Sequence, residues 1–362
     1  MTSTITRGRR TLSAVVIATA LASSLAAVSV PAAQAADAKP AAANTAAVSN
    51  ASLTWKISEC AFAACGSLAQ AQSVSGNVTK AADGFTFTGG TGTIDQLTGA
   101  LSIAYTGSAT IGNTNQGGFS ITFTDPVITV DAQGSGSLAA DASFKTSPAA
   151  TPVVANDVIV VSLPKVTPST SFTVTPPWDG VGTPASPAPV EGKQFAQSFM
   201  NVVPEALKGF FWATGTTGTN LTKAPSPVTV QYERAWKPTL LVKPTKVAKA
   251  KSTVTLSIVG VGFDPSKASP AVQGLYVVFG PNAAKAKDGY TAVGSYGASN
   301  YLQSGPDALG RFSTSLKVSG IYKTDTGTVV NGAKQVVGVS TWAAHAHAIT
   351  DWDAFTQVKF VK

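Results

Sequence analysis

The sequence predicts a mostly β protein with two domains, and three observations support this expectation. Apolar residues alternate with Ser, Thr and Gly along many short segments, which is typical of antiparallel strands with one buried face. Turns that contain glycine or proline separate these segments. The chain also has 362 residues, which is more than one β domain of ordinary size needs.

The N-terminus has the arrangement of a secretory signal peptide, which we predict over residues 1–35. Three arginines come first, an apolar run rich in Ala and Val follows over residues 12–30, and Ala33-Gln34-Ala35 is a small-residue cleavage site. A membrane anchor is the alternative, but the small residues and the cleavage motif favour removal. No second apolar stretch is long enough to span a bilayer. We therefore expect a secreted protein, extracellular or associated with the cell wall.

The two cysteines of the chain follow the first predicted strand. Residues 36–50 are rich in Ala and poor in bulky side chains, so we expect a flexible leader there. Trp55 and Ile57 then alternate as a strand, and an Ala-rich turn contains Cys60 and Cys65. In the oxidising compartment of a secreted protein these two cysteines are expected to form a disulfide rather than a metal thiolate pair. The closed loop is short, so about 2 kcal/mol is a generous value for the bridge.

Further strands are predicted throughout the first domain, which we place at residues 51–235. Their alternating or continuous apolar segments lie at Phe85–Phe87, Leu101–Tyr105, Phe119–Val130, Val158–Val161 and Pro225–Tyr232. The proline-rich stretch of residues 164–189 is predicted to be a loop.

One or two short helices are expected before the last of these strands. Phe195, Phe199 and Val203 recur every four residues, which predicts an amphipathic helix that ends at Pro204. A dense aromatic cluster follows at residues 207–212.

Several motifs of the first domain together resemble the haem-transport-associated (Htaa) domain of actinobacterial envelope proteins. The resemblance covers residues 51–235 in order and is carried by Leu53-Thr-Trp55, Tyr105-Thr-Gly-Ser108, Phe119-Ser-Ile-Thr-Phe-Thr-Asp-Pro126, Leu207-Lys-Gly-Phe-Phe211 and Lys223-Ala-Pro-Ser-Pro-Val-Thr-Val230. It implies a mostly β domain that binds haem at the cell surface for iron acquisition.

The residues that the resemblance assigns to haem binding are replaced in this chain. The family tyrosine whose oxygen coordinates haem iron falls at Ala64, and a supporting histidine falls at Asn113 or Thr114. An alanine removes the iron bond, and no nearby His, Met or thiolate is a convincing substitute. We therefore expect that ordinary haem binding at this position is lost. Tyr105 is the fallback candidate for a ligand.

A basic linker is predicted over residues 236–251, followed by an immunoglobulin-like β-sandwich over residues 252–362. The linker is either a solvated connector or a contact for anionic cell-wall polymer. Residues 252–362 have the length and strand pattern of such a sandwich, with strands expected at Thr253–Ile258, Leu275–Phe279, Phe312–Val318, Val336–Trp342 and Val358–Lys362. Two segments of this range, Thr253–Pro265 at its start and Thr341–His345 near its end, resemble the immunoglobulin-like module that accompanies Htaa domains in some secreted actinobacterial proteins.

The only two histidines, His345 and His347, offer the one candidate metal site. Two residues apart on a strand, they point to the same face, and Asp351 or Asp353 would have to supply a third ligand. The alternative is a pair on an edge strand beside two tryptophans. No nucleophile elbow, phosphate loop or His-Glu-x-x-His helix is present, so no enzymatic activity is expected.

Two functions of different classes remain at this point. The first is a non-catalytic envelope protein of the Htaa type in which the usual haem ligands are replaced. The alternative is a functional binding protein for haem or another hydrophobic ligand in iron acquisition. Haem is a possible cofactor, cell-wall polymer a possible partner, and nucleic acid is not expected.

Overall fold

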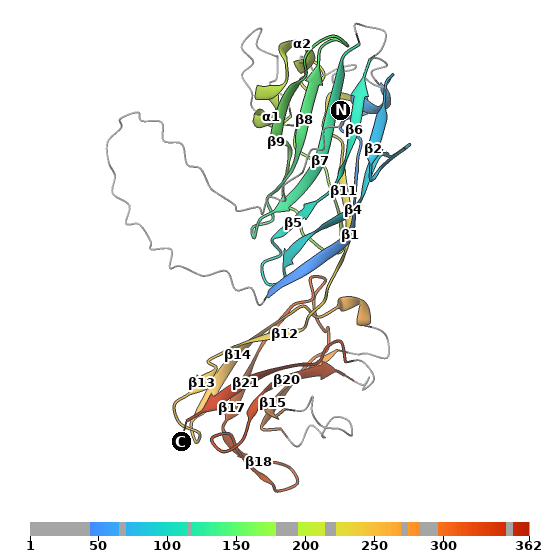
Figure 1. Cartoon of the computed structure of the whole chain (residues 1–362). Coiled ribbons are helices and arrows are strands. Elements are labelled where there is room, and N and C mark those ends of the chain that lie inside the picture. The colour runs from blue at the N-terminus through green and yellow to red at the C-terminus, as the bar shows by residue number, and fades with distance from the viewer. Residues whose placement is uncertain are drawn as a thin grey trace, which may run out of the picture. The chain divides into compact units, whose positions relative to one another are not determined.

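The computed structural model describes residues 44–64, 70–113, 118–178, 195–213, 222–268, 274–282, 296–344 and 350–361. Within these residues the chain is mostly β, as predicted (Figure 1). The strands form one sheet of 11 strands, a three-stranded sheet, a five-stranded sheet and a two-stranded hairpin. None of the helices in the described part of the chain is long and apolar enough to cross a membrane. The predicted signal peptide lies outside the described residues.

The large sheet occupies the first part of the chain, which we call the N-terminal β region. Its strands are β1 (Thr45–Trp55), β2 (Ser73–Gly76), β3 (Val78–Ala81), β4 (Gly84–Asp95), β5 (Leu101–Ala104), β6 (Gly107–Gly112), β7 (Ser120–Val130), β8 (Gly136–Lys145), β9 (Val153–Leu163), β10 (Ser171–Val174) and β11 (Val228–Arg234). The main path runs β10-β11-β1-β4-β5-β7-β6-β2, with β3 paired to β4, β8 paired to β7, and β9 paired to β8.

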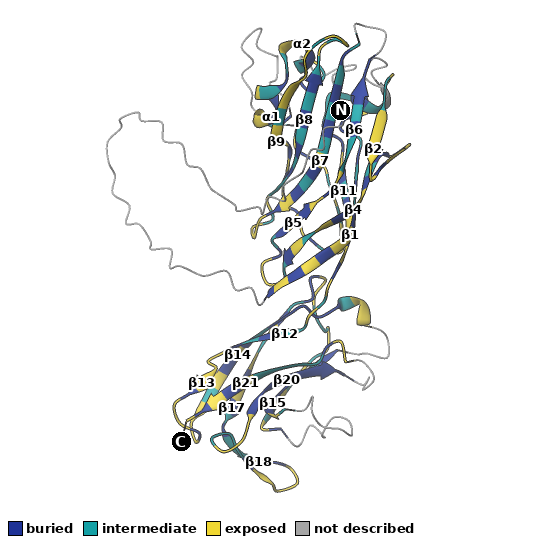
Figure 2. Ribbon diagram, viewed as in Figure 1, coloured by how far each residue is buried: buried dark blue, intermediate teal, exposed yellow. Residues whose placement is uncertain are grey.

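The alternating sequence pattern explains these strands. In β7, Ile121 and Phe123 are buried, whereas the Thr122 hydroxyl lies on the other face, 2.8 Å from the Thr110 hydroxyl of β6. Bands of buried and exposed residues alternate in the same way along β1 and β4 (Figure 2). β1, β4 and β7 thus contribute most of their apolar residues to one face, as the period of two requires.

The large sheet curls so that strands distant in the pairing order meet across a common core. Trp55 of β1 and Phe123 of β7 are not on neighbouring strands, yet their ring centroids are 5.5 Å apart. The curl has a local cause in β7, where the register with β8 shifts between Thr124 and Val127. Before this bulge β7 pairs with β6, and after it β7 pairs with β5. A bulge that bends and twists a strand allows this exchange of partners.

Two short helices, α1 (Gln197–Val202) and α2 (Glu205–Lys208), lie beside β9 and close this core (Figure 1). The amide of Ala196 donates to the Val160 carbonyl at 3.2 Å, and the Ser198 hydroxyl donates to the Ile159 carbonyl at 2.8 Å. Phe199 is fully buried, with its ring 4.9 Å from that of Phe211. The predicted amphipathic helix is therefore confirmed, although the helical residues are fewer than the pattern suggested.

The remaining strands form the C-terminal β region. They are β12 (Thr239–Lys243), β13 (Lys246–Val247), β14 (Thr253–Val261), β15 (Leu275–Pro281), β16 (Ala298–Leu302), β17 (Phe312–Ser319), β18 (Ile321–Lys323), β19 (Val329–Asn331), β20 (Val337–Ala343) and β21 (Ala354–Phe360), with a short 3-10 turn at η4 (Pro265–Lys267). The sheets β12-β14-β17 and β13-β21-β20-β15-β16 contribute side chains to one core, and β18 and β19 form a hairpin.

This arrangement is a two-layer sandwich, and its immunoglobulin-like topology remains a prediction. The second strand of the region, β13, pairs in parallel with the last strand, β21. The other strands pair antiparallel, and β14 lies between β12 and β17. Such pairings are compatible with the predicted class.

Three boundaries from the sequence need correction. The expected leader of residues 36–50 is too long, because β1 begins at Thr45 and buries Ala46 and Val48. These buried side chains are small, so their alternation gives a weak apolar signal. The proline-rich stretch of residues 164–189 is not loop throughout, because it contains strand β10, which pairs with β11.

The third correction concerns the predicted linker of residues 236–251. Strands β12 and β13 lie in it, and Leu240, Val242 and Val247 belong to the C-terminal core. The lysines of this segment are exposed, whereas the side chains of Leu240, Val242 and Val247 are buried in the core. The linker is therefore part of the C-terminal β region, which begins before residue 252.

Candidate functional site

The expected haem-ligand position lies on a single π-helical turn, η2 (Cys60–Ala64), directly after β1. Ser58 holds the start of this turn, because its hydroxyl accepts a hydrogen bond from the Ala61 amide at 3.0 Å. Ile57, just before it, is fully buried and has a φ of 71°, which is unfavourable for a β-branched residue. The chain thus leaves β1 through a constrained bend, and Cys60 and Ala61 of η2 remain buried in the core.

The other end of η2 is held by Gln72. Its side-chain amide donates to the Phe62 carbonyl at 2.8 Å and to the Ala61 carbonyl at 3.2 Å. The amide of Ala71 in turn donates to the Gly112 carbonyl at the end of β6 at 3.1 Å. The segment after η2 therefore lies against the end of β6, which brings two predicted ligand segments to the same part of the region.

The predicted ligand residues can be placed only in part. Ala64 is the last residue of η2, but its side chain lies outside the described residues, as do Cys65 and Thr114. Asn113 is buried, and its backbone amide donates to the Phe119 carbonyl at 3.1 Å. Asn113 directly follows β6, and it is one of the two positions at which the resemblance places a supporting histidine. The predicted partner of Cys60 is not described, so the disulfide remains a prediction.

Aromatic side chains surround this end of the N-terminal β region. The rings of Phe62 and Phe85 meet edge to face, with centroids 5.5 Å apart. On the neighbouring segment, Phe119 stacks on Phe210 at 5.0 Å. The amines of Lys56 and Lys80 lie 5.8 and 5.9 Å from the Phe62 ring centroid. One member of the predicted aromatic cluster of residues 207–212, Phe210, therefore stacks on the residue that precedes β7.

Tyr105, the fallback ligand, is a core residue in this structure. Its side chain is 2% exposed, and a methyl group at Gly90 would lie 2.5 Å from its ring. Neither its hydroxyl nor that of the buried Tyr232 has a hydrogen-bond partner among the described residues. Burial raises the pKa of both phenols, that of Tyr232 to about 12, so both are neutral at ordinary pH. A tyrosinate ligand at Tyr105 would require both exposure and ionisation.

The candidate metal site at His345 and His347 lies outside the described residues. Among the residues that the structure does describe, no group of three or more His, Cys, Asp or Glu side chains could hold a metal ion. The histidine pair therefore remains a prediction from sequence.

A polar groove of about 590 Å³ lies beside η2 on the outer face of β1, β4 and β11. The Lys56 amine and the Glu59 carboxylate form a 3.0 Å ion pair at its edge. Ser226, which also lines it, is 4% exposed, and its hydroxyl has no hydrogen-bond partner among the described residues. Hydroxyl groups from all three strands line this groove, namely those of Ser52, Thr54, Thr86 and Thr229.

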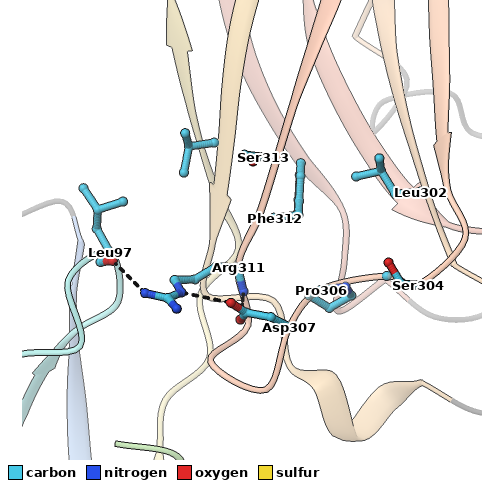
Figure 3. A pocket seen from close by; sticks show the side chains of 10 residues that line it. Leu97, Leu302, Ser304, Pro306, Asp307, Arg311, Phe312 and Ser313 are labelled. Carbon is cyan, nitrogen blue, oxygen red and sulfur yellow. Dashed lines mark hydrogen bonds and ion pairs between the residues drawn. The ribbon is translucent and has the colours of Figure 1, made fainter. Parts of the chain in front are cut away.

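A second cavity, of about 660 Å³, is lined by Leu97 and by residues of the loop between β16 and β17 (Figure 3). Arg311 pairs with the Asp307 carboxylate at 3.2 Å and donates to the Leu97 carbonyl at 3.2 Å. The same carboxylate accepts hydrogen bonds from two backbone amides of its own loop. Arg311 and Asp307 thus bind each other and the neighbouring main chain, so their role in this cavity is to hold its walls in place.

Arg234, at the end of β11, was not identified from the sequence. Its guanidinium lies 3.4 Å from the ring centroid of Trp236 and donates to the Leu309 carbonyl at 2.9 Å. Burial lowers its pKa to about 10, and the nearby Tyr232, Asp264 and Asp307 oppose this shift. The pairing of an arginine with a tryptophan two residues later was a usable signal for this contact.

These features define a curled β domain with an aromatic core and a constrained helical turn after its first strand. Residues 50–178 match the family model described as Htaa. Residues 50–178 therefore belong to an Htaa-like domain, as the sequence resemblance predicted. The Htaa family is associated with haem uptake and with the cell envelope, and it is not a family of enzymes.

Solved structures with local similarity were also found. The C-terminal domain of HtaA from Corynebacterium glutamicum is 16% identical, with 52% of this chain and 99% of that chain covered and a TM-score of 0.37. A domain-swapped dimer of a histidine-to-alanine variant of that domain is 16% identical, with 47% and 86% covered and a TM-score of 0.29. Macromomycin is 19% identical, with 34% and 100% covered and a TM-score of 0.24.

These three TM-scores are too low to support an argument about function. A comparison with the curated proteins found no match. The family assignment of the first region consequently depends on the Htaa match over residues 50–178.

Proposed function

We propose that this protein is a secreted, non-catalytic envelope protein of the Htaa type that has lost ordinary haem ligation. The observation that carries the proposal is the composition of η2, which consists of Cys, Ala and Phe residues only. None of these offers the phenolate oxygen that the family uses at this turn, and Ala64 stands at the ligand position. The Ser58 side chain accepts a hydrogen bond from this turn and the Gln72 side chain donates one to it, and both support the turn without any ligand.

The burial of Tyr105 supports the same proposal. Iron coordination by its oxygen would require the ring to leave the core and the phenol to lose its proton, although burial raises its pKa. The alternative function, binding of haem or another hydrophobic ligand, would have to use aromatic contacts such as the stacked Phe119 and Phe210. Such contacts can hold a porphyrin ring but supply no axial ligand.

We also propose an organisation into two domains, with the boundary between Arg234 and Thr239. The hydrophobic core of the N-terminal β region and that of the C-terminal β region share no residue. The C-terminal domain would be the immunoglobulin-like module, and the signal peptide would be removed near Ala36. N-terminal sequencing of the exported protein tests the cleavage site.

Haemin titration of the purified protein tests the lost ligand. The wild type is expected to bind haemin weakly and to show no defined tyrosinate spectrum. Ala64→Tyr, combined with Cys60→Ser and Cys65→Ala to open the turn, should strengthen binding and produce that spectrum. Thr114→His should strengthen binding further, because an imidazole near a phenolate orients it and tunes its basicity.

The matched control carries the same cysteine changes with Ala132→Tyr, which adds a tyrosine to the exposed turn between β7 and β8. This control should bind haemin no better than the wild type. Tight binding by the wild type, with an axial-ligand spectrum that Ala64→Tyr leaves unchanged, would contradict the proposal. Loss of that spectrum in Tyr105→Phe would then assign the ligand to Tyr105.

A further inference from the structure

A third pocket lies in the C-terminal β region, and its lining combines apolar side chains with lysines. Its volume is about 510 Å³, which is within the range of small-molecule sites. The residues that line it are Lys249, Ala250, Lys251, Ile321, Asn331, Ala333 and Lys334. The pocket is separate from η2 and from every residue considered for haem.

One wall of the pocket is the turn between β13 and β14. The amide of Ser252 donates to the Lys249 carbonyl at 3.1 Å and closes this turn. The amide of Ala250 donates to the Val361 carbonyl at 3.1 Å, next to the end of β21. Ala250 is buried, so the turn places its small side chain inward and the lysines on either side outward.

The opposite wall is formed by the hairpin of β18 and β19 and the turn that follows it. Ile321 pairs with Asn331 across the hairpin. The Asn331 side chain accepts a hydrogen bond from the Ala333 amide at 3.0 Å, and its carbonyl accepts one from the Lys334 amide at 2.9 Å. Both walls are thus fixed by hydrogen bonds to the main chain, and the pocket is formed without a ligand.

The charge of the pocket is positive and uncompensated. Lys249, Lys251 and Lys334 form no ion pair with any described residue, and no acidic residue lines the pocket. The described residues of the C-terminal β region from 239 to 361 include ten Lys and Arg but only five Asp and no Glu. The surrounding field therefore favours an anion.

The lining also disfavours a simple ion, because Ala250, Ile321 and Ala333, which form the floor, offer no hydrogen-bonding side chain. The side-chain oxygen of Asn331, which also lines the pocket, already accepts a hydrogen bond from the Ala333 amide. Lysine stems can extend along an apolar surface while their amines reach its rim. A matching ligand needs an apolar part to cover the floor and an anionic group to meet the amines.

We propose that this pocket binds a single-chain anionic amphiphile, with its hydrocarbon part on the floor and its anionic head group among Lys249, Lys251 and Lys334. Both parts of the ligand are required. Removal of the head group leaves three amines without a counter-charge, and removal of the chain leaves the apolar floor exposed to water. This site does not depend on the proposed loss of haem ligation.

Isothermal titration of the mature full-length protein with dodecanoate, below its micelle concentration, tests the proposal. The variant Lys249→Gln/Lys251→Gln/Lys334→Gln should bind at least about tenfold more weakly. The matched control Lys243→Gln/Lys267→Gln/Lys317→Gln removes the same charge from exposed lysines that do not line the pocket and should bind as the wild type does. Raising the salt concentration from about 0.05 to about 0.5 M should weaken binding.

Two further probes separate the parts of the ligand. Inorganic phosphate carries charge without a chain, octyl glucoside carries a chain without charge, and both should bind much more weakly than dodecanoate. Ala333→Glu, which places a carboxylate at the floor, should also abolish dodecanoate binding while the thermal transition is retained. Equal binding by the two lysine variants, or binding of either probe as tight as that of dodecanoate, would overturn the proposal.

Discussion

The core of the N-terminal β region buries two phenols, Tyr105 and Tyr232, and thereby raises the pKa of each. Each is less than 6% exposed, and neither hydroxyl has a hydrogen-bond partner among the described residues. A buried hydroxyl without a partner contributes desolvation cost and no compensating bond. Because the two phenols also interact electrostatically, ionisation of one disfavours ionisation of the other.

The first prediction concerns stability at high pH. Burial raises the pKa of Tyr232 from 10.0 to about 12. Above pH 10 the unfolded state ionises while the folded state stays neutral, so the free energy of unfolding should fall between about pH 10 and 12. Stability from this source is fully present below pH 10 and is lost as the pH rises.

Urea unfolding of the wild type and of Tyr105→Phe/Tyr232→Phe at several pH values checks this prediction. The double variant should be as stable as the wild type at pH 7, or more stable by up to about 1 kcal/mol, because no hydrogen bond is removed. Its alkaline loss of stability should be smaller than that of the wild type. Identical pH profiles would contradict the assigned burial.

At the scale of single elements, close contacts between strands determine which residues are tolerated. Gly90 of β4 faces the Tyr105 ring, and an added methyl group would also lie 3.1 Å from the Ala51 side chain of β1. β4 therefore needs a residue without a side chain at this point, because the Tyr105 ring and the Ala51 side chain occupy the space. In a close-packed core such a clash is relieved only by shifts of the neighbours.

Gly90→Ala should accordingly destabilise the protein by about 1–3 kcal/mol, the usual cost of overpacking. Gly209→Ala is the matched control, since nothing lies within 4 Å of an added methyl group there and the backbone φ is −57°. It should be neutral or slightly stabilising. Chemical denaturation of the two variants compares them directly, and similar losses of stability would show that the Tyr105 contact is unimportant.

The η2 turn carries a prediction about the cysteines. We expect Cys60 and Cys65 to be bridged in the mature protein, and mass spectrometry of non-reduced peptides should show the linked pair. Free thiols at both positions would refute the bridge. Because the closed loop is short, its loss should cost at most about 2 kcal/mol. Both Cys60→Ala and Cys60→Ser remove the bridge. Because Cys60 is fully buried, only the serine variant also buries a hydroxyl, and the difference between the two variants measures that added cost.

At the scale of the whole molecule, the described residues form two large hydrophobic cores and a small third cluster of Val278, Tyr296 and Trp342. The N-terminal core contains the aromatic group around Phe199, and the C-terminal core lies between the two sheets of the sandwich. Strands β12 and β13 belong to the second of these cores, although they lie in the lysine-rich segment. A chain with two cores of this kind is expected to unfold in two units.

Isolated fragments should show where the second unit begins. A fragment of residues 236–362 should give a cooperative thermal transition, because it keeps β12 beside β14 and β13 beside β21. A fragment of residues 252–362 lacks Leu240, Val242 and Val247, which are no more than 6% exposed, and should be less stable or molten. Circular dichroism melting checks both, and equal melting temperatures would place β12 and β13 outside the cooperative unit.

The sequence by itself determined the fold class, most strands and the resemblance to the Htaa domain. Alternation such as that of Ile121 and Phe123 is a local property, and each strand keeps it whichever partner it pairs with. The helix around Phe199 was predictable for the same reason. The sequence also predicts that Ala64 stands where the family places its ligand, and this assignment remains a prediction.

Only the tertiary structure decided how these local elements meet. The burial of Tyr105 results from the approach of β4, whose Gly90 leaves room for the ring, and no local pattern records that contact. The pocket between Lys249 and Lys334 joins segments about 80 residues apart, so it exists only once the sandwich is closed. Strand pairing also reassigned Leu240 and Val242 from a linker to a core, because burial depends on the partner surface and not on the residue alone.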